Sequence, residues 1–446
     1  MNKIVQTKFG LVEGLEFEDG YKFYGIPFAK PPLGELMFKH SLEPDKWSDT
    51  YKAFKPKSNP IQREGNFSVG NNNLDCLYLN IYVPKCAKDK IVPVMVWVYG
   101  GSYATGGTGL KDNNIAEYES LEFANEVGCI IVNFNYRLNV YGYLNLNSLD
   151  KNFDLNNGIS DQILALKFIK ENIENFNGDK NNITLFGQSA GASSILALMT
   201  IEKAKQYFNK AITMSPVSEH FFTYKESAKL AKKYLKYLKI KNIDLKKLYY
   251  LDPEDIKAAN KKLANYAYRK GELRCPFSPT VDGYDLKDFP INKLHESKKE
   301  LLIGNVIDEG NLFLLKAPDI ALPFMVKLFR LKVKRGKGAY RRRASDALTH
   351  KLYLDPLLKI LSRYKAKAYK YEYSHTTPDC KKLGLITFHA CDVPVLFNYN
   401  TSFEKVDDPE TQRVGKMMRE LFGKFARNEF DDFKTYQESK GTIKIK

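Results

Sequence analysis

The chain has 446 residues, of which 43% are hydrophobic and 27% are charged. This composition provides enough apolar material for a large core, so it excludes a disordered tail and a small domain held together by disulfides. Lysine and arginine (69) outnumber aspartate and glutamate (52), and the net charge of +17 allows nucleic-acid or membrane binding but also serves solubility alone. The six cysteines include no Cys-x-x-Cys pair, so neither a disulfide framework nor a zinc site is predicted.

The amino-terminal segment predicts no export signal. No apolar run follows its first lysine, as a signal peptide would require. No stretch approaches the length of about 18 apolar residues that a membrane span needs. Because the cysteines are also scattered, we expect a protein of the reducing cytoplasm.

Basic residues concentrate in one segment. From Lys327 to Arg343 the chain carries nine basic residues and no acidic one, and the segment ends in three consecutive arginines. The simplest interpretation is a solvated loop or cap. The alternative is a docking site for anionic lipid head groups or for an acidic partner. No nucleic-acid-binding signature accompanies the charge, so we expect no nucleic-acid partner.

Short apolar runs rich in β-branched residues predict buried strands of a parallel sheet that is covered on both faces. These runs occupy residues 92–99, 129–136, 182–186 and 300–306, and residues 368–374 are a further strand candidate. Helical periodicity is found at residues 161–175, 190–204, 225–238 and 253–268. The alternation predicts an open α/β sheet, and the carboxyl ends of its strands are where chemistry is expected.

The strongest motif is Gly187-Gln188-Ser189-Ala190-Gly191. It follows an apolar strand and precedes a helical run, which is the context of a nucleophile elbow. The tight turn leaves no room for side chains at the flanking positions, and this accounts for the two glycines. Ser189 would stand above the sheet, where the amino end of the helix stabilises developing negative charge. The motif therefore predicts Ser189 as a nucleophile.

A serine hydroxyl is a poor nucleophile until a base takes its proton, and that base must be oriented by a third group. In α/β hydrolases these residues follow in the order serine, acid, histidine. Glu309 comes after the strand 300–306, and His389 lies late in the chain, after the strand 368–374. Spacing alone leaves two alternatives open, namely that His389 is a surface loop histidine and Glu309 a solvated acid in a turn.

A glycine-rich loop after the strand 92–99 predicts an oxyanion hole. The backbone N–H groups of Gly101 and Ser102, with that of Ala190 after the nucleophile, can meet the negative oxygen of a tetrahedral intermediate. The same loop is one residue away from a phosphate-binding loop, but Gly107 stands where such a loop requires lysine. Nucleotide binding is therefore disfavoured.

Together these residues resemble the type-B carboxylesterases, the family that includes cholinesterases and bacterial para-nitrobenzyl esterases. Matching blocks run in the same order from about Val5 to Asn428. They are residues 24–34 (YGIPFAKPPLG), 75–80 (DCLYLN), 135–137 (NYR), 161–162 (DQ), 176–179 (FNGD), 279–283 (PTVDG) and 308–310 (DEG). Many collinear blocks are far more specific than any single motif.

The resemblance implies an α/β-hydrolase fold, with a central, mostly parallel, twisted sheet, helices on both faces and a helical cap. We expect one domain over residues 1–446, with cap insertions around 220–275 and 311–365. The implied fold agrees with the alternation of strands and helices described above.

The resemblance also implies individual roles. Ser189 becomes the nucleophile, His389 the general base and then acid, and Glu309 the group that orients His389. The three amides named above fall on the family's oxyanion-hole positions. Arg137 and Asp161 match a buried ion pair whose role is structural.

Two departures from the family's pattern concern the site. The third glycine of the oxyanion loop is Ser102 here, and a positive φ at this position would strain the serine. Because the loss of one oxyanion donor costs about 10²–10³ in kcat, Ser102 puts turnover in question. Gln188 stands where many members carry glutamate, and the missing negative charge should favour the neutral imidazole of His389.

Other departures lie outside the triad. Pro216 replaces the glycine that follows a helper serine in relatives, so the support of the triad by Ser215 is left open. Cys76 matches a half-cystine whose expected partner is absent, which again favours a reducing compartment. Met37 and Leu74 replace an arginine and a glutamate that pair in relatives, so no orphan buried charge is created.

The sequence therefore predicts a serine hydrolase that cleaves small-molecule carboxylic esters through an acyl-enzyme intermediate, with no metal or cofactor. One alternative is a catalytically weak or silent binding protein on the same fold. Another is an interfacial lipase that is recruited through the basic segment between Lys327 and Arg343.

Overall fold

The computed structural model describes residues 2–62, 69–112, 115–315, 317–334, 336, 339–401 and 404–446. Its main feature is a sheet of 12 strands within these ranges. In spatial order, with β4 (Tyr51–Lys52) paired to β2, the strands are β1 (Asn2–Thr7), β2 (Gly10–Phe17), β3 (Gly20–Pro27), β7 (Tyr78–Pro84), β11 (Ile130–Phe134), β8 (Val92–Val98), β12 (Gly178–Gln188), β13 (Lys210–Met214), β16 (Glu300–Val306), β17 (Ala368–Tyr373) and β18 (Ile443–Ile445).

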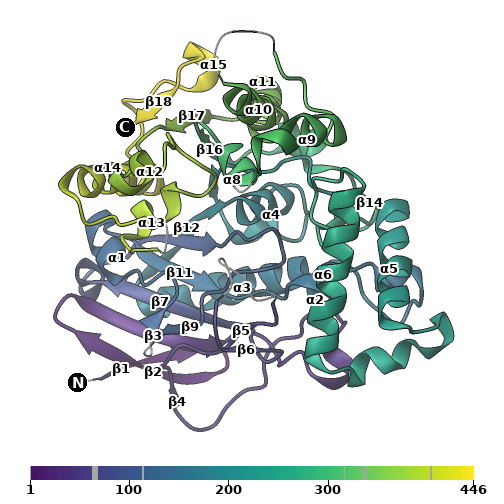
Figure 1. The fold of residues 1–446 in the computed structure, drawn as a ribbon. Coiled ribbons are helices and arrows are strands. Elements are labelled where there is room, and N and C mark those ends of the chain that lie inside the picture. The colour runs from purple at the N-terminus through teal and green to yellow at the C-terminus, as the bar shows by residue number, and fades with distance from the viewer. Residues whose placement is uncertain are drawn as a thin grey trace.

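The sheet changes from antiparallel to parallel at β11. Along the main strand order the neighbours are antiparallel from β1 to β11, and every neighbouring pair from β11 to β18 is parallel. The short strand β4 is parallel to β2. Leu185 of β12 lies opposite Val96 of β8 and Ala211 of β13, so β12 is at the centre of the parallel part. In Figure 1 the sheet runs from the purple amino-terminal strands at the bottom to the green and yellow strands at the top.

Helices connect and cover the strands. The α-helices within the described ranges are α1 (Leu121–Val127), α2 (Asn139–Tyr143), α3 (Asn157–Asn172), α4 (Ala190–Leu198), α5 (Tyr224–Leu238), α6 (Pro253–Arg269), α7 (Pro290–Lys293), α8 (Asn311–Leu314), α9 (Leu322–Leu328), α10 (Tyr340–Thr349), α11 (Asp355–Arg363), α12 (Pro378–Lys382), α13 (Asp392–Phe397), α14 (Pro409–Ala426) and α15 (Tyr436–Ser439). A π-helical turn, His350–Leu354, joins α10 to α11.

Shorter elements complete the chain. Three two-stranded sheets are formed by β5 (Asn59–Pro60) with β6 (Asn72–Asn73), β9 (Leu110–Asp112) with β10 (Ile115–Ala116), and β14 (Phe222–Thr223) with β15 (Thr280–Val281). The 3₁₀ helices are Gly34–Leu36, Lys85–Lys88, Leu146–Ser148, Ile173–Phe176, Lys205–Tyr207, Asn242–Tyr250, Leu294–Glu296 and Asp319–Ala321. No helix in the described part of the chain is long and apolar enough to cross a membrane.

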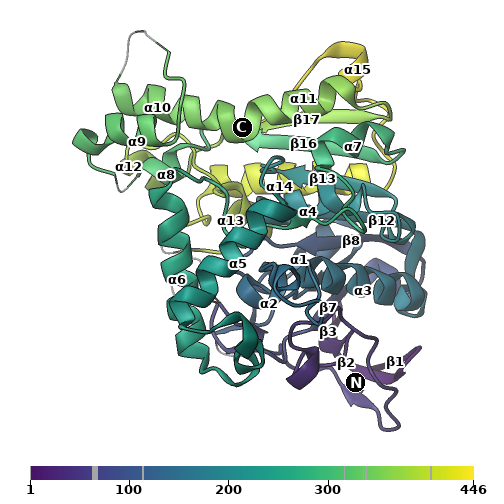
Figure 2. The ribbon, with the colours of Figure 1, turned by 90° about the vertical axis from the view of Figure 1, so that its right-hand side faces the viewer.

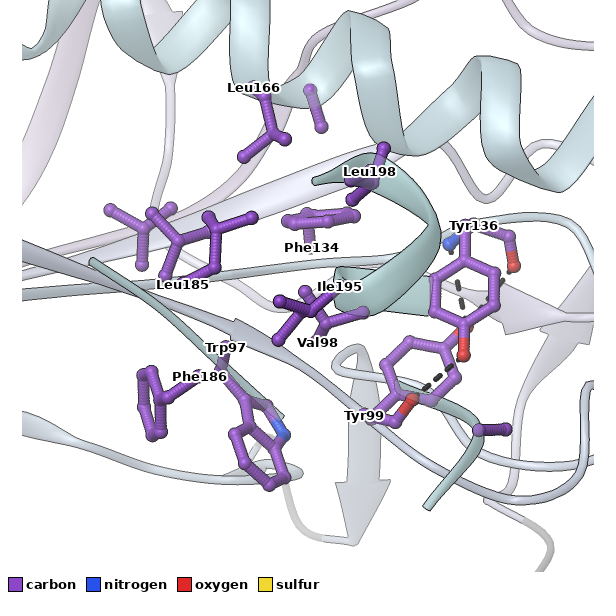
Figure 3. Close-up of a cluster of buried hydrophobic side chains, with 14 of the residues drawn as sticks. Trp97, Val98, Tyr99, Phe134, Tyr136, Leu166, Leu185, Phe186, Ile195 and Leu198 are labelled. Carbon is purple, nitrogen blue, oxygen red and sulfur yellow. Dashed lines mark hydrogen bonds between the residues drawn. The ribbon is translucent and has the colours of Figure 1, made fainter. Parts of the chain in front are cut away.

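The hydrophobic core occupies both faces of the sheet. On one face α3 and α4 pack on β12, and Figure 3 shows Leu166 and Leu198 from these helices above the strands. On the other face Trp97 and Phe186 contact the ring of Phe397 on α13, with ring centroids 4.8 and 6.1 Å away. Alternating side chains of the central strands therefore meet helices on both sides, as a buried parallel sheet requires.

The structure confirms the predicted open α/β sheet, with corrected boundaries. The five predicted strands correspond to β8, β11, β12, β16 and β17. The predicted helix 190–204 is too long, because α4 ends at Leu198 and the hydroxyl of Thr200 donates to the carbonyl of Ala197. No strand is predicted after residue 374, whereas Ile443–Ile445 adds the edge strand β18 beside β17.

The two segments predicted as cap insertions are helical. In the first, α5 and α6 pack side by side as the teal pair in Figures 1 and 2. In the second, α8, α9 and α10 gather at one end of the molecule, and α10 packs on α8 and α9. The division into one domain with two insertions stays a prediction.

Candidate active site

Ser189 lies in a turn between β12 and α4, in a strained conformation. Its φ and ψ are 54° and −120°, and its N–H donates to the carbonyl of Met214 at 2.9 Å. A Cβ atom on Gly191 would lie 1.9 Å from the carbonyl oxygen of Val98, and one on Gly187 would lie 2.5 Å from the same oxygen. The predicted strand–turn–helix context is confirmed, because only glycine fits at both flanking positions.

His389 comes from a turn just before α13 and reaches Ser189. Its Nε2 lies 2.8 Å from Oγ of Ser189, and both residues are 6% exposed. Its Nδ1 lies 2.6 Å from Oε2 of Glu309, a fully buried residue in the turn after β16. An ionised carboxylate can only accept, so Nδ1 carries the proton and Nε2 is left to accept from the hydroxyl.

Glu309 is held in turn by the backbone. Its second oxygen, Oε1, accepts the N–H of Val306 at 3.1 Å. The structure thus brings together the three residues predicted from the sequence, although they are distant along the chain. The alternatives of a surface histidine and a solvated acid are wrong, because both side chains are buried and bonded to each other.

The glycine-rich loop after β8 lies against Ser189. A Cβ atom on Gly100 would be 3.1 Å from Cβ of Ser189. Along the loop φ is 109° at Gly101 and 56° at Ser102, so the serine does occupy a left-handed conformation. Among the described residues, the N–H groups of Gly101, Ser102 and Ala190 have no acceptor. Unpaired amides near the Ser189 hydroxyl are donors of the kind that an oxyanion hole uses.

Gln188 contacts the same histidine. Its side-chain nitrogen Nε2 lies 3.2 Å from Nε2 of His389, and the residue is 4% exposed. An amide N–H can only donate, so this contact needs the lone pair of an unprotonated imidazole nitrogen. The position therefore suits the neutral form of His389.

Ser215 is buried at the end of β13 with a φ of 50°. Its N–H donates to the carbonyl of Gly304 at 2.7 Å, but its Oγ has no hydrogen-bond partner in the part of the chain that the structure describes. A contribution of Ser215 to the triad stays a prediction.

Three further side chains near the site are not predicted from the sequence. The rings of Tyr353 and Phe313 lie 4.9 and 5.9 Å from the ring of His389. Burial, with smaller effects of Arg274 and His389, lowers the pKa of His220 to about 3, so this second imidazole beside the site is neutral. In the sequence nothing distinguishes the aromatic residues from ordinary core aromatics.

Arg137 and Asp161 form the expected buried ion pair. Nε and Nη2 of Arg137 donate to the two carboxylate oxygens at 2.9 and 2.6 Å, and the side chains are 2% and 0% exposed. The pair fixes the loop after β11 to α3. Within the described ranges, no group of three or more His, Cys, Asp or Glu side chains is arranged to hold a metal ion.

A strained serine at the carboxyl end of a central parallel strand, bonded to a histidine–glutamate pair, defines the class as the α/β hydrolases. Residues 1–322 match the model of the carboxylesterase family, and the chain belongs to that family. It is therefore a carboxylic ester hydrolase by class, as the sequence predicts.

Individual relatives are similar to this chain over most of its length. The para-nitrobenzyl esterase of Bacillus subtilis (strain 168) is 30% identical over 92% of this chain and 86% of its own. The crystal protein of Dictyostelium discoideum is 29% identical over 94% of this chain and 80% of its own. A solved structure titled PNB esterase superimposes with a TM-score of 0.83 and 28% identity, covering 100% of this chain and 96% of the other.

Proposed function

We propose that Ser189, His389 and Glu309 are the catalytic triad of this hydrolase. Oγ of Ser189 attacks the ester carbonyl while Nε2 of His389 takes its proton. Glu309 keeps the imidazole in the required tautomer and stabilises the imidazolium that forms. The single observation that carries the proposal is the continuous chain of contacts, Oγ to Nε2 at 2.8 Å and Nδ1 to Oε2 at 2.6 Å.

The amides of Gly101, Ser102 and Ala190 hold the negative oxygen of the tetrahedral intermediate. His389 then donates its proton to the leaving alcohol, and the acyl group stays on Ser189. Water, activated by the same imidazole, attacks the acyl-enzyme and releases the acid. These steps use the chain's own residues throughout.

The test is hydrolysis of p-nitrophenyl acetate, butyrate and octanoate by the wild-type protein and by Ser189→Ala. We expect activity that is lost in Ser189→Ala, and labelling of the wild type alone by a fluorophosphonate. The acyl chain length of the ester that is cleaved fastest indicates the length of the acyl-binding site. A folded wild type that neither hydrolyses these esters nor takes the label would contradict the proposal and favour the silent binding protein.

Binding of the second cap segment to a membrane is supported by fewer residues than the basic segment contains. Arg341 pairs with Asp319, and Arg342 with Asp308, so two arginines of the basic segment serve the chain itself. Arg335, Lys337 and Gly338 lie outside the described residues. Lys327 is exposed and has no carboxylate partner among the described residues.

Exposed apolar side chains accompany Lys327. Ile320 and Phe324 are 91% and 68% exposed. Phe324 precedes Lys327 by three residues on α9, so the two share one face of the helix, and Ile320 lies in the 3₁₀ helix just before it. We propose that Ile320, Phe324 and Lys327 bind an anionic lipid surface, because they combine two exposed apolar side chains with an unpaired basic one.

The test is flotation with vesicles of phosphatidylcholine, with and without phosphatidylglycerol. Binding to anionic vesicles should be lost in high salt and in the double variant Ile320→Ser/Phe324→Ser. It should survive in Tyr250→Ser, which removes an 88% exposed side chain elsewhere. No binding to anionic vesicles at low salt would end this part of the proposal.

We also propose that the protein works in a reducing compartment such as the cytoplasm. No disulfide joins any of the six cysteines, and burial raises the pKa of the Cys76 thiol well above its usual range, which keeps it protonated and unreactive. Thiol titration of the unreduced, denatured protein should find six thiols. A disulfide in the freshly isolated protein would argue against this compartment.

A further inference from the structure

The turn that carries Glu309 also carries Asp308, a fully buried carboxylate with no part in the proposed chemistry. Its Oδ1 accepts the hydroxyl of Ser345, and its Oδ2 accepts from Arg342 and, at 2.7 Å, from the side-chain amide of Asn311. A buried carboxylate is costly unless it is paired and hydrogen-bonded. Asp308 therefore has the partners that an ionised, permanently buried acid needs.

Asp308 connects the turn to the loop that carries His389. Its backbone N–H donates to Oγ1 of Thr387 at 2.9 Å, and Asn311 donates to the carbonyl of Thr387 at 3.0 Å. Thr387 precedes His389 by two residues. The two loops that supply the base and its orienting acid are thus joined to each other next to the triad.

Helix α10 joins the same network at separate points. Arg342 and Ser345 lie on this helix and bond to the Asp308 side chain, while Oγ1 of Thr349 accepts the N–H of Gly310 at 3.0 Å. These contacts lie on both sides of Glu309 in the sequence. A displacement of α10 would therefore act directly on the turn that holds Glu309.

The neighbouring Arg341 differs from Arg342. It donates to the backbone carbonyls of Leu314 and Ala317 and pairs with Asp319, which is 83% exposed, and such an exposed ion pair contributes little. Arg342 is itself 41% exposed, but its partner Asp308 is 0% exposed. Unlike Arg341, Arg342 neutralises a buried charge beside the triad.

We propose that Asp308 and Arg342 are positioning residues, which fix the Glu309 turn and the His389 loop in their active arrangement and tie both to helix α10. The inference rests on the proposed roles of Glu309 and His389. It gives the basic segment an internal function that its sequence does not reveal.

The charge of Arg342 matters as well as its position. Burial raises the pKa of Asp308, whereas Ser345 and Arg342 act to lower it. The other charged groups that face Asp308 are Glu309 and Asp346, and Asp346 bonds to Arg342 at 3.2 Å. Without Arg342, the negative charges of these carboxylates are not neutralised. The cluster of carboxylates and the neighbouring triad therefore keep a proton up to a higher pH.

The test compares Arg342→Gln, Arg342→Lys and Arg341→Gln on a soluble p-nitrophenyl ester. We expect Arg342→Gln to lower kcat about tenfold to about a hundredfold, because catalysis is sensitive to small misplacements, with little change in KM. The acid limb of its pH profile, in which kcat/KM falls as the pH decreases, should move to higher pH. Arg342→Lys should recover part of kcat and the original limb, and the matched control Arg341→Gln should behave like the wild type.

The double variant Asp308→Asn/Arg342→Gln separates charge from position. The acid limb of this double variant should lie at the same pH as that of the wild type, because no unpaired charge is left. Its kcat should stay low. A folded Arg342→Gln with the kcat and pH profile of the wild type would overturn the inference. Loss of kcat with an unmoved limb would also overturn it, since that result indicates only structural damage.

The failure of this inference is distinct from that of the proposed function. If Ser189→Ala is inactive and Arg342→Gln is normal, the triad stands and the positioning role is wrong. If Ser189→Ala retains full activity, the triad itself is wrong.

Discussion

The side-chain nitrogen of Gln188 lies 3.2 Å from Nε2 of His389, the atom that faces Oγ of Ser189 at 2.8 Å. Two hydrogen-bond donors thus converge on one lone pair of the imidazole. Gln188 can donate only while Nε2 is unprotonated, so it acts against the imidazolium form.

Gln188→Glu should move the acid limb of kcat/KM to higher pH by about one unit. A carboxylate at this distance favours the protonated imidazole through its charge. Initial rates on p-nitrophenyl butyrate between about pH 5 and about pH 9 measure the shift. The variant Gln188→Met, which adds no charge, is the control, and coincident profiles for Gln188→Glu and the wild type would refute the prediction.

Ser102→Gly should stabilise the protein while preserving catalysis. Ser102 has a φ of 56°, and a left-handed conformation costs a residue with a Cβ about 1–2 kcal/mol, which glycine avoids. We expect the free energy of unfolding to rise by about 1 kcal/mol and kcat to be equal or higher. Urea unfolding and kcat measure the two effects. Ser102→Ala keeps the strained backbone and should match the wild type, and equal stability of all three would show that the strain is absent.

Glu404→Gln should reduce the loss of stability as the pH rises from about 5 to about 8. Burial raises the pKa of Glu404 to about 7, although Cys380 and Thr377 donate to its carboxylate. An acid whose pKa is raised on folding contributes stability that is complete below about pH 4 and is lost as the pH rises through about 7. The wild type should therefore lose up to a few kcal/mol between about pH 5 and about pH 8 that Glu404→Gln retains.

Urea unfolding at both pH values measures the difference for Glu404→Gln. Asp392→Asn offers a parallel case, because burial raises the pKa of Asp392 to about 8 and neither of its carboxylate oxygens has a partner among the described residues. If both variants lose as much stability as the wild type, these acids are not protonated in the folded state.

Arg137→Met should be strongly destabilising. It leaves the carboxylate of Asp161 buried without its partner, and breaking such a pair costs about 3–5 kcal/mol. The double variant Arg137→Met/Asp161→Leu should lose less than either single change, because no unpaired charge is left. Midpoints of urea unfolding test this order, and a double variant less stable than both single variants would contradict it.

Much of the site is predictable because its chemistry constrains the sequence locally. The turn at Ser189 has room only for glycine at both flanks, so the motif is visible without a structure. Glu309 and His389 are weaker predictions, since chain order gives only a region for each. The block at residues 308–310 narrows the acid to Glu309, whereas His389 follows from its late position and the family resemblance. Their contact at 2.6 Å becomes evident only in three dimensions.

The remaining features depend on contacts between residues that are distant in the sequence, and no local sequence pattern predicts such contacts. Strand β18 has three residues with a lysine between two isoleucines, and it is a strand only because β17 offers a free edge. Arg342 and Arg341 are adjacent and chemically identical, yet one neutralises a buried acid and the other a solvated one. Sequence gives their charge, whereas the packing of α10 decides their roles.

Ser189 and His389 are separated by 200 positions along the chain, and Glu309 lies between them. Contacts between residues so far apart in the sequence form late in folding, because the long intervening segment must first be ordered. Recovery of esterase activity after dilution from denaturant should therefore lag behind recovery of helical circular dichroism. Enzyme turnover would then report the last step of folding, in which the Glu309 turn and the His389 loop meet Ser189.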